Sequence, residues 1–226
     1  MKTLISDFDK TLFDNHYYVN IKKVNEFVDD GNMFIIATGR NITSLKKEIS
    51  GKNIKFSYLI CNDGGIIFDK DLNIIYRKDI DNESAIKIFD ELNQNDFIAN
   101  TYMDDCFVYT KDKTCKINRI IAKPIDIKKT NKLLNDINNK YDNVYGYASS
   151  NWLNINNKNI NKGLAIKKLE ELVNLGEIYT IGDNVNDISM NKLYTSFSIK
   201  GNKKLDDIST YNVNNFIEAI NKLMND

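Results

Sequence analysis

Two aspartates, one residue apart, end the first apolar run of the chain. The segment "LISDFDKTLFD", at residues 4–14, places Asp7 and Asp9 directly after that run. Carboxylates at the end of a buried strand repel each other and cost free energy to remove from water. A bound cation would relieve this repulsion, so the pair indicates a site with chemistry to perform.

Three more groups of polar residues follow predicted elements farther along the chain. One follows the apolar run at 33–37, one opens the helix expected at 161–174, and one follows the run at 177–181. In an open parallel sheet, ligands bind at the carboxyl ends of the strands, so we expect these groups to converge with the first pair on one crevice. Their members are Thr38, Gly39, Arg40, Lys162, Gly163, Gly182, Asp183, Asn186 and Asp187.

The residue types in this set suit the transfer of a phosphoryl group. Clustered carboxylates without Cys or His ligands favour a hard, oxygen-seeking cation, and Mg²⁺ is the natural choice. Thr38, the backbone N–H groups after it and the Lys162 ammonium can hold phosphate oxygens. Asp7 would attack phosphorus in line, and Asp9 would protonate the leaving oxygen and later deprotonate a water. For the first step, a neighbouring anion or partial burial would have to keep a proton on Asp9.

The elements that must position these residues alternate between strands and helices. Apolar runs predict buried strands at 3–8, 33–37 and 58–61, with helical spacing between them. The same alternation resumes after residue 157. This order predicts an α/β fold with a parallel sheet, helices on both faces and right-handed crossovers.

The pattern changes between the two parts of this alternation. Two predicted helices are each followed by two strands, and the first two strands are expected at 98–103 and 106–111. This is an αββαββ unit with an antiparallel sheet. The sequence therefore predicts a core in two parts, interrupted by an inserted small α+β domain. The predicted ranges are 1–79 and 158–226 for the core and 80–157 for the insertion.

Composition and charge argue against several classes of protein. Lys plus Arg and Asp plus Glu both number 31, so the formal net charge is +0. This balance provides no electrostatic case for binding nucleic acid or an anionic membrane. No apolar stretch approaches the ~20 residues that span a bilayer, and "MKTLISDFD" reaches acidic residues before a signal-peptide core develops. The three cysteines form no CxxC pair, so we expect a cytoplasmic location.

Four motifs, in order, resemble those of the haloacid dehalogenase (HAD) superfamily of phosphohydrolases: "DFDKT", "ATGR", "NKG" and "GDNVND". The insertion after the third strand resembles the type-IIB cap of the Cof-type branch. The resemblance implies a Rossmann-like core, Mg²⁺, Asp7 as nucleophile and Asp9 as acid and base with its backbone carbonyl on the metal. It also implies a second pair of acids at the metal and a set of phosphate- and substrate-binding residues. These are Asp183 and Asp187 for the metal, and Thr38, Gly39, Arg40, Lys162 and Asn186 for the phosphate and substrate.

Two features depart from the pattern of the family. Lys10 stands where the family more often has glycine, although both aspartates and Thr11 are in place. The insertion is also shorter than is usual for the Cof-type branch. Its two αββ repeats resemble the minimal cap of the archaeal phosphoglycolate phosphatase and the sucrose-phosphatase relatives.

The resulting hypothesis is a cytoplasmic, Mg²⁺-dependent phosphatase that acts on a small phosphorylated metabolite, either a sugar phosphate or a short-acid phosphate. We expect a monomer or homodimer, with no nucleic-acid or membrane partner. A phosphomutase resembling phosphomannomutase is an alternative, because it shares the motifs and the type of cap. A phospho-accepting switch resembling a response-regulator receiver also uses clustered acids, Thr and Lys. The insertion, and the position of Lys162 before Asp183, disfavour that alternative.

Other residues of the insertion have less specific interpretations. Trp152, Tyr145 and Tyr147 are expected in the core of the inserted domain. The Asp104–Asp105 hairpin and Arg119 are candidates for substrate specificity, because the loops of such caps face the active site in the family.

Overall fold

The computed structural model describes residues 1–149 and 152–225, and it divides the chain into two compact units. The first unit consists of Met1–Arg40, Ser44–Tyr76 and Asn161–Asp226, and the second of Asn41–Thr43 and Arg77–Ile160. In the described part of the chain, no helix has the length and apolar character that crossing a membrane requires. The predicted boundaries of the insertion, 80–157, stay a prediction.

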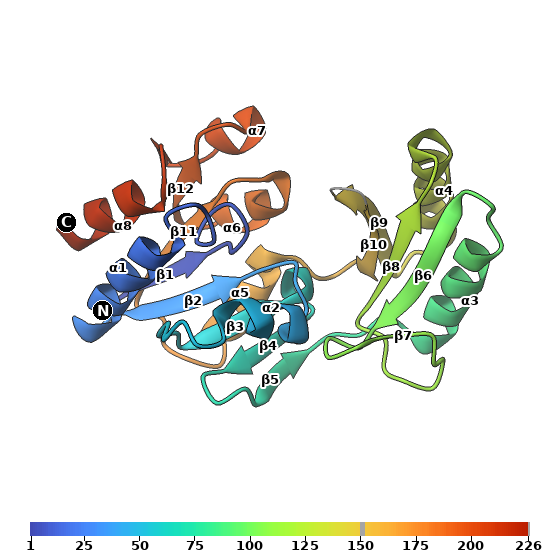
Figure 1. Cartoon of the computed structure of the whole chain (residues 1–226), viewed down its shortest axis with the longest axis horizontal. Helices are drawn as coiled ribbons and strands as arrows, with labels where there is room; N and C mark the ends of the chain where they lie inside the picture. Colours follow the sequence, from blue (N-terminus) through green and yellow to red (C-terminus); the bar gives the residue numbers. More distant parts are fainter. Residues whose placement is uncertain (150–151, 226) are drawn as a thin grey trace. The chain divides into compact units, whose positions relative to one another are not determined.

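The first unit is built on an eight-stranded sheet with the strand order β13-β12-β11-β1-β2-β3-β4-β5 (Figure 1). Neighbouring strands from β13 to β3 pair in parallel, and β4 pairs with β3 in the antiparallel direction. The strands are β1 (Lys2–Ser6), β2 (Met33–Ala37), β3 (Tyr58–Cys61), β4 (Ile66–Asp69), β5 (Ile74–Arg77), β11 (Glu177–Gly182), β12 (Thr195–Ile199) and β13 (Tyr211–Val213).

Helices cover both faces of this sheet, as the alternation of elements predicts. One apolar cluster joins Ile5 and Ile35 of the sheet to Ile166 of α5, whereas Phe34 packs edge-on against Phe216 of α8 on the other face. Because both faces are covered, β1 and β2 are buried almost throughout. The helices are α1 (Tyr17–Asp29), α2 (Ile42–Ile49), α5 (Lys162–Glu170), α6 (Ile188–Asn191), α7 (Lys203–Asp206) and α8 (Phe216–Asn225), with 3₁₀ turns η1 (Asn62–Gly64) and η2 (Val185–Asp187).

The second unit is a five-stranded antiparallel sheet with two helices on one face (Figure 1). The strand order is β7-β6-β8-β10-β9. The apolar core lies between the helices and the sheet, where Ile88 and Ile137 meet Ile120 and Ile155. The elements are α3 (Asn82–Asn93), β6 (Ile98–Asp104), β7 (Tyr109–Thr110), β8 (Arg119–Pro124), α4 (Ile127–Lys140), β9 (Val144–Ser149) and β10 (Trp152–Asn157). The parallel-rich sheet and the separate antiparallel sheet confirm the predicted fold class.

Two strands of the second unit differ from the prediction: one is shorter than expected, and β8 was not predicted. The strand expected at 106–111 is reduced to the two-residue edge strand β7, and β6 pairs along its length with β8 instead. A turn interrupts the expected strand, because Asp105 Oδ1 accepts hydrogen bonds from the N–H groups of Phe107 and Val108 and Cys106 has a φ of 80°. The edge strands β5 and β13 of the first unit were also not predicted.

The three aromatic residues predicted to lie in the core of the insertion do not lie there, and this prediction is wrong. Trp152 is 37% exposed and Tyr145 is 55% exposed, while Tyr147 is half-buried. Side chains alternate along a strand, and the positions of β10 that face the helices belong to Leu153 and Ile155. The aromatic rings therefore lie on the face of the sheet opposite the helices.

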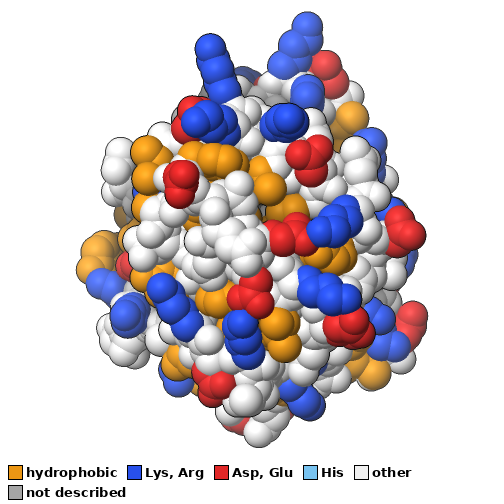
Figure 2. All heavy atoms as spheres, turned by 90° about the vertical axis from the view of Figure 1, so that its right-hand side faces the viewer, with side chains coloured by type: hydrophobic (Ala, Val, Ile, Leu, Met, Phe, Trp, Pro, Cys, Tyr) orange, Lys and Arg blue, Asp and Glu red, His pale blue; other side chains and the backbone are white. Residues whose placement is uncertain are grey.

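The outer surface of the second unit carries charges of both signs. Figure 2 shows Lys and Arg side chains interspersed with Asp and Glu over the face seen from the right-hand side of Figure 1. The zero formal net charge of the chain agrees with this mixture.

Candidate active site

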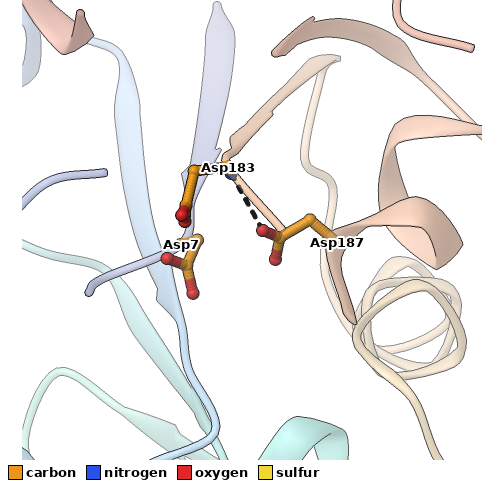
Figure 3. A group of neighbouring side chains, drawn as sticks. All are labelled: Asp7, Asp183 and Asp187. Carbon is orange, nitrogen blue, oxygen red and sulfur yellow. Dashed lines mark hydrogen bonds between the residues drawn. The ribbon is translucent and has the colours of Figure 1, made fainter. Parts of the chain in front are cut away.

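The parallel pairing of β1 with β11 places the first and the last acidic motif at adjacent strand ends. Asp7 follows β1, and its backbone N–H donates to the carbonyl of Ile181 at 2.9 Å. Asp183 follows β11 directly. Carboxylate oxygens of Asp7, Asp183 and Asp187 lie within 4.8 Å of one another, and Figure 3 shows the three carboxyl groups gathered at one place. Segments some 180 residues apart thus form one acidic cluster, as the topology of an open parallel sheet predicts.

The turn after β11 holds Asp187 in this cluster. Its Oδ2 accepts hydrogen bonds from the backbone N–H groups of Asp183 and Asn184, both at 3.0 Å. A Cβ on Gly182 would lie 2.4 Å from the Asp187 carboxyl carbon. Only glycine therefore allows the carboxylate to pack against the end of the strand.

A buried lysine lies among the carboxylates. Lys162, the first residue of α5, is fully buried, and its Nζ lies 2.5 Å from Asp7 Oδ1 and 2.7 Å from Asp187 Oδ1. The side chain of Asn161 caps α5 by accepting the N–H of Leu164. A Cβ on Gly163 would lie 2.2 Å from the carbonyl oxygen of Ser189, so this glycine lets α5 approach α6.

The electrostatics of the cluster favour additional positive charge. Burial raises the pKa of the Asp7 carboxyl well above its usual range, because the help from Lys162 does not outweigh desolvation and the repulsion of neighbouring acids. Burial and Asp187 likewise raise the pKa of Asp183. Burial alone would lower the pKa of Lys162, but Asp187 and Asp7 raise it overall.

This charge balance fits a divalent metal ion. Asp7 and Asp187 pair with the single ammonium group of Lys162, and Asp183 adds a third carboxylate, so the ionised cluster carries an excess of negative charge. The donor set is made of oxygen only, which suits a hard cation such as Mg²⁺. The acidic cluster of Asp7, Asp183 and Asp187 could therefore hold a metal.

Asp9 lies apart from this cluster and has its own cation. Its carboxylate is not a member of the acidic group found among the described residues, and Arg40 binds it with two hydrogen bonds, of 2.9 and 2.7 Å. The neighbour of Asp9 is thus a cation, and the side chain of Asp9 is 46% exposed. A neighbouring anion or partial burial was expected instead, because either would keep a proton on Asp9. A metal contact through the Asp9 backbone carbonyl stays a prediction.

The other predicted phosphate- and substrate-binding residues occupy the neighbouring loops of the first unit. Thr38 is buried directly after β2, and its Oγ1 accepts the N–H of Arg40 at 3.1 Å. Gly39 is half-buried beside Asp63, and Asn186 is half-buried in η2. Their roles toward a ligand stay predictions.

Lys10 adopts a left-handed conformation with a φ of 64°. Glycine adopts this region of backbone space without steric cost, which explains why a residue other than glycine is a departure here. The turn nevertheless closes, because the N–H of Lys10 donates to the carbonyl of Phe13 at 3.0 Å.

Two residues of the site had no role in the sequence analysis. Thr11 donates to Asp183 Oδ1 at 3.1 Å, and so it connects the first acidic motif to the last. Glu48 accepts a hydrogen bond from Arg40 at 3.1 Å. The spacing of Arg40, Ser44 and Glu48 at four-residue intervals is a signal that could have identified the second contact.

Comparisons with known proteins agree with this architecture. The sequence model of the haloacid dehalogenase-like hydrolase family matches residues 4–123 and 100–200. The chain is 23% identical to the 5-amino-6-(5-phospho-D-ribitylamino)uracil phosphatase of Bacillus subtilis, over 85% of this chain and 80% of the relative.

Two solved structures show the shared fold. One is a haloacid dehalogenase-like hydrolase from Bacteroides thetaiotaomicron, with a TM-score of 0.85 and 16% identity over 98% of this chain and 99% of the other. The second is the HAD subclass IIB sugar phosphatase BT4131, with a TM-score of 0.75 and 17% identity over 100% of this chain and 98% of the other. The chain therefore belongs to the haloacid dehalogenase-like hydrolases, and it has the fold of their subclass IIB.

Proposed function

We propose that the protein is a Mg²⁺-dependent phosphatase that hydrolyses a small phosphorylated metabolite, a sugar phosphate or a short-acid phosphate, through an aspartyl-phosphate intermediate. The observation that carries the proposal is the cluster in which Asp7 and Asp187 both pair with the buried Lys162 and Asp183 adds a third carboxylate. The names of two similar proteins, a phosphatase of a phosphoribitylamino compound and a sugar phosphatase, support the class of substrate.

In this mechanism, Asp7 supplies the nucleophile. A carboxylate oxygen of Asp7 attacks phosphorus, and the bond from phosphorus to the leaving oxygen breaks as Asp9 protonates that oxygen. A water then attacks phosphorus while Asp9 removes its proton, and the bond to Asp7 breaks to release phosphate. Both aspartates return to their starting states, so no further reactant is needed.

The remaining residues bind and neutralise the phosphoryl group. Thr38, Asn186 and the ammonium of Lys162 hold its oxygens, with Gly39 contributing backbone. Asp7, Asp183 and the Asp9 carbonyl would hold Mg²⁺, with support from Asp187, and the bound ion would supply positive charge that offsets the charge of the phosphoryl oxygens. Fixed positive charge in a buried place is the main requirement of phosphoryl transfer.

The proposal extends to the organisation of the protein. The core comprises residues 1–79 and 158–226, and the inserted domain at 80–157 selects the leaving group, as a short cap like that of phosphoglycolate phosphatase or the sucrose-phosphatase relatives. We also propose a cytoplasmic location and a monomer or homodimer.

A phosphate-release screen over several dozen phosphorylated metabolites, with and without Mg²⁺, tests this function. We expect Mg²⁺-dependent release that is strongest for sugar or short-acid phosphates. The Asp7→Asn variant should lose at least about 10³-fold in kcat, because it removes the attacking oxyanion.

Failure to release phosphate from any compound, or full activity of the Asp7→Asn variant, would contradict the proposal. Isomerisation of a hexose phosphate without phosphate release would favour the phosphomutase alternative instead.

A further inference from the structure

The guanidinium group of Arg40 is hydrogen-bonded to other side chains of the protein. Its Nε and Nη2 donate to the two carboxylate oxygens of Asp9 at 2.9 and 2.7 Å, and its Nη1 donates to Glu48 at 3.1 Å and to Ser44 at 3.3 Å. Three of its nitrogens are thus hydrogen-bonded in a planar, two-pronged arrangement. Such a fork fixes both the position and the rotation of a carboxylate, which a single charge cannot do.

The turn that carries Asp9 also contacts the guanidinium group of Arg40, through the aromatic rings of Phe8 and Phe13. The backbone closes on itself, because the N–H of Phe13 donates to the carbonyl of Phe8 at 2.7 Å. This closure stacks the two rings, with centroids 5.2 Å apart and planes inclined by 6°. The guanidinium carbon of Arg40 lies 5.4 Å from one ring centre and 6.0 Å from the other. The guanidinium group therefore rests on an aromatic platform as well as on its hydrogen bonds.

The helix α2 fixes the other side of the guanidinium. Ser44 and Glu48 are four residues apart on α2 and therefore lie on one face of the helix, and both accept hydrogen bonds from Arg40. Arg40 thus connects the loop after β1 to a helix outside that loop. The half-exposed carboxylate of Asp9 would otherwise be free to rotate about its side-chain bonds.

We propose that Arg40 is a positioning residue that orients the Asp9 carboxylate for proton transfer, and that Glu48 holds Arg40 in place. The inference rests on the proposed function, and it assigns to Arg40 a role on Asp9 rather than on the phosphate. Arg40 forms and breaks no covalent bond in this role. Its contribution is to keep the Asp9 side chain where its protonated form reaches the leaving oxygen in the first step and its ionised form reaches the water in the second.

Two substrates with different leaving groups test this role. A sugar phosphate leaves as an alkoxide that must receive a proton, whereas p-nitrophenyl phosphate leaves as a stable phenolate that needs none. In the Arg40→Met variant, we expect phosphorylation of Asp7 by the sugar phosphate to slow by about 10²-fold, in the range typical for loss of a general acid. With p-nitrophenyl phosphate, we expect a rapid burst of nitrophenolate followed by slow turnover, because only the hydrolysis of the aspartyl phosphate then needs Asp9. KM should change little for the sugar phosphate, for which both steps slow, whereas KM for p-nitrophenyl phosphate should fall together with kcat, because the phosphorylated enzyme accumulates.

Conservative variants separate orientation from charge. Arg40→Lys keeps the positive charge but loses the fork, so it should restore only a small part of the lost rate. Glu48→Gln keeps an acceptor for Arg40 and should show the same pattern as Arg40→Met with a smaller loss.

Arg77→Met is a matched control. Arg77 also binds an aspartate, with its Nε donating to both carboxylate oxygens of Asp79, but it lies in the second unit. This variant should leave unchanged the ratio of the kcat values for the sugar phosphate and p-nitrophenyl phosphate.

The outcomes distinguish the inference from the proposed function. If the wild-type protein with Mg²⁺ hydrolyses neither substrate, the proposed function fails. If the wild type is active and Arg40→Met raises KM equally for both substrates without a nitrophenolate burst, Arg40 binds the phosphate and the positioning role is wrong. Full recovery in Arg40→Lys would also overturn it, because charge alone would then be sufficient.

Discussion

The two units each bury an ionic cluster, and the two clusters differ in how their charges balance. In the first unit, the fully buried Lys162 is shared by Asp7 and Asp187, and Asp183 adds a third carboxylate. In the second unit, Arg119 pairs with Asp104 at 2.8 Å, and their side chains are 5% and 0% exposed. One cluster has an excess of acid, whereas the other has one charge of each sign.

The hydrogen bonding of the clusters differs in the same way. The Asp104 carboxylate accepts the backbone N–H of Cys106 at 2.8 Å and the side-chain amide of Asn41 at 3.3 Å in addition to its bond from Arg119. A balanced and hydrogen-bonded pair is a structural element, since it needs no further ion. An unbalanced cluster at the carboxyl ends of parallel strands indicates a ligand of positive charge. The suggestion that Arg119 selects the substrate is therefore less well supported than a structural role.

The largest effect on stability and activity is expected when the lysine of the first cluster is replaced. Lys162→Met leaves buried carboxylates without their partner, so we expect a loss of about 3–5 kcal/mol in the free energy of unfolding and the loss of measurable phosphatase activity. Mg²⁺ should restore part of the stability, because a divalent ion can replace the missing charge. Urea unfolding of the variant with and without Mg²⁺ measures both effects. If Mg²⁺ did not stabilise the variant, the first cluster would have no need of a further cation, and the proposed difference between the clusters would be wrong.

The corresponding change in the second unit should destabilise the protein, and Mg²⁺ should not restore the lost stability. Arg119→Met leaves Asp104 buried and unpaired, and we expect a loss of about 3 kcal/mol that Mg²⁺ does not reverse in the same unfolding assay. The double variant Arg119→Met, Asp104→Leu serves as the control, because it removes both charges and should recover much of the lost stability. If Mg²⁺ rescued Arg119→Met as well as Lys162→Met, the two clusters would not differ in the way proposed.

The smallest effect on stability is expected at a buried group that is neutral and belongs to neither cluster. The hydroxyl of Tyr17 is buried and has no hydrogen-bond partner among the described residues. Burial, together with Glu48 and Tyr18 and despite Arg40, raises its pKa from 10.0 to about 12. The unfolded chain therefore loses this proton at lower pH than the folded protein does, and stability falls as pH rises from about 10 to about 12.

The Tyr17→Phe variant should lack this part of the alkaline destabilisation. At pH 7 we expect the variant to be more stable than the wild type by about 1 kcal/mol, because it lacks a buried hydroxyl without a partner. At the upper end of the alkaline range this difference should grow by a further ~1–2 kcal/mol. Thermal unfolding of both proteins at pH 7 and across the alkaline range measures it. Parallel pH profiles for the two proteins would contradict the assignment.

Much of the fold followed from local patterns. The apolar runs located β1, β2, β3 and β11, and the change of pattern after β5 indicated a separate antiparallel unit. The strand at 106–111 was misplaced because the Asp105 turn and the pairing of β6 with β8 depend on side-chain hydrogen bonds and on a register between distant residues. The exposed Tyr145 and Trp152 show the same limit, because a strand pattern does not say which face the helices cover.

The positions of Asp7 and Asp183 after buried strands, and the oxygen donors without His or Cys, could be predicted from the sequence alone. These properties depend on residue type and on short-range alternation, and both are present in the sequence whatever the long-range contacts are. The cation that pairs with each acid depends on the tertiary structure: Lys162 pairs with Asp7, and Arg40 pairs with Asp9. Such pairings join residues far apart in the chain, and they are set by strand order and by the space between packed side chains rather than by local preference.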